Sequence, residues 1–203
     1  MIKNVIFDVG GVLMDFDTGA LCRALTENEA DAQLLDAETF GHPDWISLDR
    51  GVPEAAVLAG FQSHLPQRLH AAAAELLKRW DEWLTPEKDI NALALELDAM
   101  GIQVYILSNT SPEFYRFSKR IPAWPVVKGC ILSFEEKLLK PDPEIYRRLL
   151  SRFGLAPGES FFVDDNHLNI EAAKWCGLKG ELYRHDIVRL RASLRAEGVE
   201  VKP

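Results

Sequence analysis

Short apolar runs that alternate with amphipathic segments constrain the fold of this chain more than any other feature. The runs are rich in β-branched and aromatic residues, are mostly apolar on both faces, and cover residues 3–9, 102–108, 128–134, 160–165 and 180–184. Such runs are typical of strands in a parallel sheet that is covered on both sides. Amphipathic segments at 91–100, 142–154 and 169–177 lie between them. The alternation predicts right-handed β-α-β crossovers and a doubly wound α/β sheet.

The alternation is interrupted once, between the first and second predicted strands. Helical patterns cover residues 19–35, 53–65 and 69–84, and Gly41, Pro43, Gly51 and Pro66 separate them. We interpret residues 15–87 as an all-helical cap and residues 1–14 and 88–203 as the core. An insertion that leaves the sheet at the end of the first strand lies over the edge where open α/β sheets bind ligands.

Composition and charge exclude several classes of partner. The 203 residues carry a formal net charge of −8, which disfavours nucleic acid and anionic membranes, since both require a basic face. No apolar run approaches the roughly 20 residues that span a bilayer. The three cysteines are far apart and form no CxxC pair, so we interpret them as reduced packing residues. We expect a soluble, cytoplasmic protein, and the sequence makes no prediction of its oligomeric state.

Polar side chains stand at or just after the ends of four predicted strands. Taken singly, such a carboxylate or Ser-Asn pair is an ordinary cap or turn residue, and a lone lysine is an ordinary solvated side chain. Parallel strands, however, bring their carboxyl ends to one rim of the sheet, and the assembled groups suit phosphoryl transfer. They are Asp8, Ser108, Asn109, Lys140, Asp164 and Asp165.

Four motifs, in this order, resemble the haloacid dehalogenase superfamily and its phosphatase branch in particular. They are VIFDVGGVL (5–13), ILSNT (106–110), KPDPEIY (140–146) and FFVDDNHLNIEAA (161–173). With the helical cap, the resemblance covers nearly the whole chain. It implies a three-layer Rossmann-like core with the first strand central, Mg²⁺ as cofactor and an aspartyl-phosphate intermediate.

The resemblance assigns a role to each residue of the motifs. Asp8 would attack phosphorus, because a carboxylate is ionised at neutral pH and forms a mixed anhydride that water then cleaves. Mg²⁺, a hard cation, would take oxygen ligands from Asp8, the Gly10 carbonyl and Asp165, with Asp164 helping directly or through water.

The remaining motif residues would hold the phosphoryl group. Ser108 and Asn109 would donate hydrogen bonds to its oxygens, and Lys140 would neutralise developing charge and tether Asp8. Gly10 and Gly11 would let the backbone turn sharply and approach the phosphate and the metal, which a Cβ would hinder.

One position departs from the pattern. Most phosphatases of this superfamily carry a second aspartate two residues after the nucleophile as general acid and base, and here that position is Gly10. Asp17 is a candidate substitute, with capping of the helix that begins near Gly19 as the alternative. Asp15 is interpreted as a cap or linker residue and His167 as an exposed loop residue. A good leaving group, as in an anomeric sugar phosphate, would need less acid catalysis.

Other reactions and roles remain open from the sequence. A binding or regulatory module with little turnover has small need of a nucleophile, and a metal-independent haloacid dehalogenase has no use for the paired carboxylates of VDD. Phosphonate cleavage requires a cap lysine, and Lys78 and Lys88, the lysines near the cap, are interpreted as solvated or boundary residues.

The cap is expected to select the substrate. The polar segment SLDRGVPEAA (47–56) resembles a turn placed over the active site, in which Arg50 could bind an anionic or hydroxyl-rich substrate or pair on the surface with neighbouring acids. Trp45 is expected to be buried between cap and core. The sequence thus predicts a Mg²⁺-dependent hydrolase of a small phosphorylated metabolite, with a sugar phosphate favoured.

Overall fold

The computed structural model describes residues 1–202, and at its centre is a five-stranded parallel sheet. The strands are β1 (Asn4–Phe7), β4 (Gln103–Ser108), β5 (Val127–Leu132), β6 (Ser160–Asp164) and β7 (Lys179–Leu182), in the order β5-β4-β1-β6-β7. β1 pairs with β4 on one side and with β6 on the other, so the first strand is central, as predicted. All five predicted strands are found.

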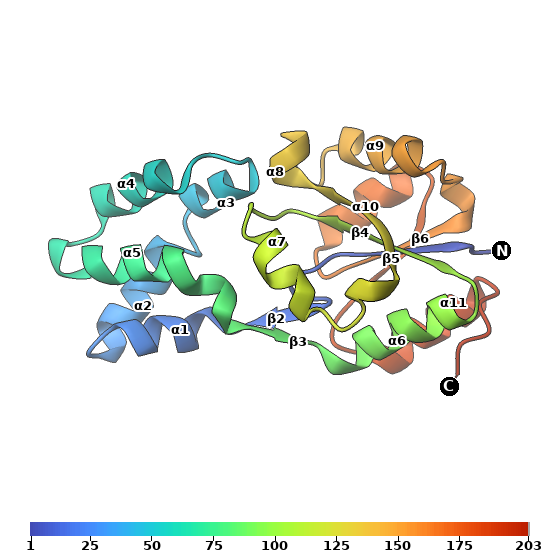
Figure 1. Cartoon of the computed structure of the whole chain (residues 1–203), viewed down its shortest axis with the longest axis horizontal. Helices are drawn as coiled ribbons and strands as arrows, with labels where there is room; N and C mark the ends of the chain where they lie inside the picture. The colour runs from blue at the N-terminus through green and yellow to red at the C-terminus, as the bar shows by residue number, and fades with distance from the viewer. Residues whose placement is uncertain (203) are drawn as a thin grey trace.

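Helices cover both faces of this sheet (Figure 1). α6 (Lys88–Ala99) and α11 (Ile187–Ala196) lie on one face, and α9 (Pro143–Phe153) and α10 (His167–Trp175) lie on the other. Successive side chains of β1 point to opposite faces, so Val5 and Phe7 belong to one apolar cluster and Ile6 to the other. The predicted three-layer α/β core is therefore confirmed.

The helices between the first two core strands form a separate group on the left of Figure 1. They are α1 (Thr18–Leu25), α2 (Glu29–Glu38), α3 (Pro43–Asp49), α4 (Glu54–His64) and α5 (His70–Arg79), with short 3₁₀ turns at Gln67–Leu69 and Trp80–Trp83. Two short antiparallel strands, β2 (Met14–Phe16) and β3 (Leu84–Pro86), carry the chain out to this group and back. The predicted division at residues 15 and 87 falls in and beside these strands, and we keep it as an interpretation.

The helical limits within this cap differ from the prediction in three places. The helix predicted over 19–35 is two helices, because Asn28 caps α2 by accepting a hydrogen bond from the Asp31 amide and the chain at Thr26 is extended. The α-helix predicted to reach residue 84 ends at Arg79 and continues as a 3₁₀ turn. The predicted polar turn over 47–56 begins only after Asp49, where α3 ends.

Several short elements had no counterpart in the prediction. α7 (Phe114–Phe117) and α8 (Ser133–Glu136) follow β4 and β5, and α8 ends the strand predicted over 128–134 at Leu132. Further 3₁₀ turns cover Ser118–Arg120, Trp124–Val126 and Pro157–Glu159. Within residues 1–202, every helix is too short or too polar to cross a lipid bilayer.

Cap and core are joined by direct polar contacts as well as by the hinge strands. The guanidinium of Arg116, after β4, pairs with Asp81, which is buried in the cap. On the other side, the Ser133 hydroxyl donates to the Asp49 carbonyl (2.6 Å), and the Lys137 ammonium lies 3.3 Å from the Arg50 carbonyl.

Apolar packing also joins the two parts, because one apolar cluster runs from Phe7 in the core to Phe61 in the cap. The cap is therefore closed onto the carboxyl edge of the sheet.

Candidate active site

Asp8 is the residue at which the central strand meets the cap. It directly follows β1, its amide donates to the Val163 carbonyl of β6 (2.9 Å), and only 8% of its surface is exposed. The Val9 amide donates to Asp8 Oδ1 (2.7 Å), which fixes the carboxylate orientation. The neighbouring strand therefore holds Asp8 at the rim of the sheet.

Lys140 supplies the positive charge beside Asp8. Its side chain has no exposed surface, and its Nζ lies 2.8 Å from Asp8 Oδ1 and 2.6 Å from Asp164 Oδ2. Burial alone would lower the pKa of Lys140, but the two carboxylates outweigh it and hold that pKa above its usual range. Lys140 is therefore a charged ammonium that bridges the ends of β1 and β6.

Asn109 positions the backbone of Lys140. Its side-chain Nδ2 donates to the Lys140 carbonyl (3.0 Å), and its Oδ1 accepts from the Lys140 amide (2.8 Å). Ser108, predicted as a phosphate donor with Asn109, is buried at the end of β4, and its hydroxyl lies 3.3 Å from the Asn109 carbonyl. The ends of β1, β4 and β6 are thus linked through Lys140.

The two carboxylates after β6 have different surroundings. Asp164 is fully buried and accepts hydrogen bonds from Lys140, the Asn169 side chain (2.9 Å) and the Asn166 amide (2.8 Å). Asp165 is exposed, and its carboxylate lies against Gly11, where an added Cβ would be 2.4 Å from Asp165 Oδ2. Gly11 also has a φ of +69°, which favours glycine. The sequence analysis predicts that a Cβ at either Gly10 or Gly11 would hinder approach to the phosphate and the metal. In the structure, only a Cβ at Gly11 would collide, with Asp165, and nothing lies within 4 Å of a Cβ at Gly10.

These carboxylates form a group able to bind a divalent cation. Asp8, Asp164 and Asp165 each offer an oxygen, and the three oxygens lie within 4.8 Å of one another. Burial, helped by the negative charge of Asp164, raises the pKa of Asp8 to about 7 even though Lys140 opposes the shift. Partial burial and Asp164 also raise the pKa of Asp165. The single positive charge of Lys140 does not neutralise the three carboxylates when all are ionised. A group of oxygen ligands with net negative charge fits Mg²⁺.

A cavity of about 100 Å³ lies between this rim and the cap. It is smaller than the roughly 300–1,000 Å³ of typical ligand pockets, consistent with a cap that is closed over it. Core and cap both line it: Val9, Gly10, Ser108, Asn109, Thr110, Ser111 and Phe117 from the core, and Trp45, Leu48, Asp49, Trp80 and Leu84 from the cap and hinge. Trp45, predicted to be buried between cap and core, is only partly buried and packs on Trp80 with ring centroids 5.4 Å apart.

Asp49 is a site residue that the sequence analysis did not select. It ends α3, lines the cavity with Gly10 and Ser108, and has its carbonyl anchored by Ser133. Burial raises the pKa of Asp49 to about 7, although the charge of Lys140 opposes the shift. Within residues 1–202, no hydrogen bond or ion pair engages its carboxylate. The predicted polar segment 47–56 includes Asp49, but the sequence analysis names Arg50 as its substrate-binding residue.

Asp8, Lys140, Asp164 and Asp165 are not among the lining residues, but they contact one another at the neighbouring rim. Four other candidates neither line the cavity nor join this group. Asp17 caps α1 by accepting from the Ala20 amide (2.7 Å), and its side chain is 72% exposed, as in the capping alternative. Arg50 is exposed at the end of α3. Asp15 lies 3.8 Å from His185, and His167 is exposed on the first turn of α10.

The buried pair of Asp8 and Lys140 lies at the carboxyl edge of a doubly wound sheet, where open α/β sheets bind ligands. The family can be named as well. The sequence pattern of the haloacid dehalogenase-like hydrolases matches residues 2–177. The chain belongs to that family and is an enzyme.

Its relatives include phosphatases. The sesquiterpene phosphatase AstK of Aspergillus oryzae is 29% identical over 186 residues, which cover 88% of each chain. The D-ribitol-5-phosphate phosphatase of Bacteroides thetaiotaomicron is 27% identical over 200 residues, covering 88% of this chain and 90% of that one. An (S)-2-haloacid dehalogenase of Burkholderia cepacia is related too, at 26% identity.

A solved structure shows the same fold. The haloacid dehalogenase family enzyme BT-2542 of Bacteroides thetaiotaomicron, in complex with magnesium and inorganic phosphate, has a TM-score of 0.69 to this chain at 22% identity. The match covers 91% of this chain and 95% of that one. Magnesium is thus a ligand of a protein with this fold.

Proposed function

We propose that this enzyme is a Mg²⁺-dependent phosphatase that hydrolyses a small phosphorylated metabolite through an aspartyl-phosphate on Asp8. The observation that supports the proposal is the convergence of Asp8, Lys140, Asp164 and Asp165 at one edge of the sheet. Val9 and Gly10, which follow Asp8 in the chain, line the cavity under the cap. Asp8, Asp164 and Asp165 are the residues that would hold the ion, with the Gly10 carbonyl as a further ligand. When bound, Mg²⁺ offsets the repulsion between the phosphoryl oxygens and the attacking carboxylate.

In the first step, a carboxylate oxygen of Asp8 forms a bond to phosphorus while the bond from phosphorus to the leaving oxygen breaks. Lys140 contacts Asp8, which favours the ionised form of the nucleophile and orients it. Ser108 lies at the cavity wall, where its hydroxyl can donate to a phosphoryl oxygen. The product of this step is the mixed anhydride of Asp8 and phosphate.

The leaving oxygen needs a proton, and Gly10 cannot supply one. We assign this role to Asp49, because Asp49 lines the cavity with Gly10 and Ser108 and its carboxyl group is free of hydrogen-bond partners within residues 1–202. Protonated Asp49 transfers its proton to the leaving oxygen and becomes a carboxylate. In the second step that carboxylate accepts a proton from the water that attacks phosphorus, which releases phosphate and regenerates Asp8.

The substrate class is set by what the cap presents. Trp45, Trp80 and Leu48 give the cavity an apolar wall opposite the phosphate-binding rim, and Asp49 is the cap carboxylate on it. A tryptophan face suits the ring of a sugar as well as a hydrocarbon chain. We therefore propose a sugar phosphate as the substrate, with a terpenoid phosphate as the second substrate class.

The experiment is a phosphate-release screen over sugar phosphates, terpenoid phosphates, nucleotides and acyl phosphates, each with Mg²⁺ and with a chelator. We expect release that depends on Mg²⁺. Chloride release from 2-haloacids in the presence of chelator would instead identify a metal-independent dehalogenase. Tight ligand binding without release would identify a binding or regulatory module.

A further inference from the structure

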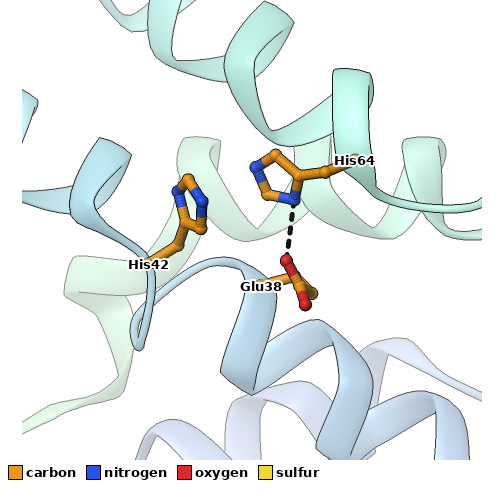
Figure 2. Close-up of side chains that lie close together, drawn as sticks. All are labelled: Glu38, His42 and His64. Atoms are coloured by element: carbon orange, nitrogen blue, oxygen red, sulfur yellow. Dashed lines mark ion pairs between the residues drawn. The ribbon is translucent and has the colours of Figure 1, made fainter.

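A second cluster of metal-ligating side chains lies in the cap, outside the active site. Glu38 is the last residue of α2, His42 caps α3 and His64 is the last residue of α4. One ligand atom from each of the three lies within 4.8 Å of the others. Figure 2 shows the two imidazole rings and the Glu38 carboxylate turned toward one another.

The contacts within this cluster are close. His64 Nδ1 lies 2.9 Å from Glu38 Oε2, and the His42 and His64 rings are stacked with centroids 4.1 Å apart. The Asp44 carboxylate reaches both rings, with Oδ2 at 3.4 Å from His42 Nδ1 and 3.6 Å from His64 Nε2. His64 therefore has one carboxylate near each of its ring nitrogens.

Two glycines allow the three segments to approach. A Cβ at Gly41 would be 2.8 Å from the Ala37 carbonyl oxygen, so glycine permits the tight turn that brings His42 back over the end of α2. A Cβ at Gly60 would be 2.4 Å from Asp44 Oδ2, so glycine on α4 leaves room for that carboxylate. The packing of the chain thus places all four polar side chains together.

The charge and exposure of the cluster suit a cation. Its four side chains are 25% to 36% exposed, so an ion can enter from solvent yet is partly shielded from it. Within the part of the chain that the structure describes, no lysine or arginine forms an ion pair with Glu38 or Asp44. Two carboxylates beside two imidazoles therefore lack a permanent positive charge.

We propose that Glu38, His42 and His64 form a binding site for a divalent transition metal, with Zn²⁺ as the best fit, and that Asp44 orients the His64 imidazole. Two imidazole nitrogens and a carboxylate oxygen form a common donor set for zinc, and a carboxylate on the second ring nitrogen is its usual support. Mg²⁺ prefers oxygen ligands alone and is a poor match. The bound ion ties α2, α3 and α4 together, and α3 carries Asp49 at its other end.

The ligand variants are His42→Asn and His64→Gln, and His70→Gln is the matched control. Asparagine retains a side-chain oxygen for the helix cap that His42 now provides. His70 is also in the cap, but among the described residues the polar partner of its ring is the Leu65 carbonyl (3.0 Å) rather than a carboxylate. Zn²⁺ is titrated into each protein in excess Mg²⁺, so that the active-site carboxylates are occupied. Affinity is measured by competition with a chelating dye.

We expect saturable Zn²⁺ binding and a higher unfolding temperature with Zn²⁺ in the native protein and in His70→Gln. His42→Asn and His64→Gln should bind Zn²⁺ at least about tenfold more weakly, while their Mg²⁺-dependent activity is unchanged. The chain has five histidines, so imidazole NMR resonances assigned with these variants locate the ion independently of activity. Equal affinity in His64→Gln and the native protein, or Zn²⁺ shifts that spare His42 and His64, would overturn the proposal.

Discussion

The ammonium of Lys140 lies 2.8 Å from Asp8 Oδ1, and the lysine side chain has no exposed surface. A buried ammonium is stable only when carboxylates compensate its charge, and here the second carboxylate is Asp164. Asp8, the proposed nucleophile, and Lys140 therefore stabilise each other in the folded protein.

Lys140→Met tests this dependence. It leaves Asp8 and Asp164 buried together without a cation, so we expect the free energy of unfolding to fall by about 3–5 kcal/mol and activity to be lost. Urea unfolding measures the first effect and phosphate release the second. Lys137→Met, at an exposed position that touches the cap, should change stability by no more than about 0.5 kcal/mol. Equal stability of the two variants would contradict the assigned role of Lys140.

Gly11→Ala and Gly101→Ala form a matched pair. Both glycines have a positive φ, so each alanine should destabilise the fold by about 1–2 kcal/mol. Only at Gly11 would the new Cβ collide with Asp165, since nothing lies within 4 Å at Gly101. We expect Gly11→Ala alone to weaken Mg²⁺ activation, measured as the Mg²⁺ concentration that gives half-maximal rate. A normal Mg²⁺ response in Gly11→Ala would refute a metal ligand at Asp165.

Asp49→Asn tests the proton donor. We expect the rate on an alkyl phosphate to fall by about 10²–10⁴-fold, and the rate on an aryl phosphate with a good leaving group to fall far less. Because the pKa of Asp49 is raised to about 7, the native rate on the alkyl substrate should decline as pH rises through that value. Asp17→Asn alters only the cap of α1 and an exposed contact with Arg23, so it should leave both rates intact. An equal loss of rate on both substrates would show that Asp49 is not the general acid.

Glu136 is predicted to give a pH-dependent contribution to stability. Burial favours a higher pKa of Glu136, but hydrogen bonds from Arg148 (2.8 Å) and Arg152 (2.6 Å) outweigh it and lower that pKa below its usual value. The contribution is therefore complete at neutral pH and is lost as the pH falls through the lowered value. We expect Glu136→Gln to cost about 1–2 kcal/mol at pH 7 and much less below about pH 4.

The comparison for that prediction is Glu144→Gln, because Glu144 lies 3.5 Å from Arg147 in an exposed pair. Such pairs contribute little, so a change within about 0.5 kcal/mol at either pH is expected. Chemical denaturation at the two pH values measures both variants. A constant difference between native protein and Glu136→Gln across pH would contradict the ion-pair explanation.

The core could be predicted from sequence because its apolar runs are buried on both faces, and burial leaves a strong local pattern. The cap was harder. The break between α1 and α2 depends on one capping side chain, Asn28, inside a continuous helical pattern. α3 was missed because Gly41 and Pro43 are typical of a turn, although Pro43 begins the helix.

Some residues of the candidate active site could be predicted from sequence motifs, and others could not. Asp8, Lys140 and the two aspartates after β6 stand in motifs at strand ends, where parallel geometry brings them together. Asp49 has no such signal, because its position over Gly10 depends on how the cap packs on the core through contacts such as that of Ser133 with the Asp49 carbonyl. The roles of Asn109 toward Lys140 and of Gly11 toward Asp165 also needed three-dimensional distances.

The most direct test of the central claim is the rate of Mg²⁺-dependent phosphate release by Asp8→Asn, measured beside the native enzyme on the best substrate of the screen. The amide keeps the size of the carboxylate but cannot form the acyl phosphate, so the rate should fall by at least about 10³-fold while circular dichroism shows a folded protein. A folded Asp8→Asn variant that releases phosphate at the native rate would contradict the account.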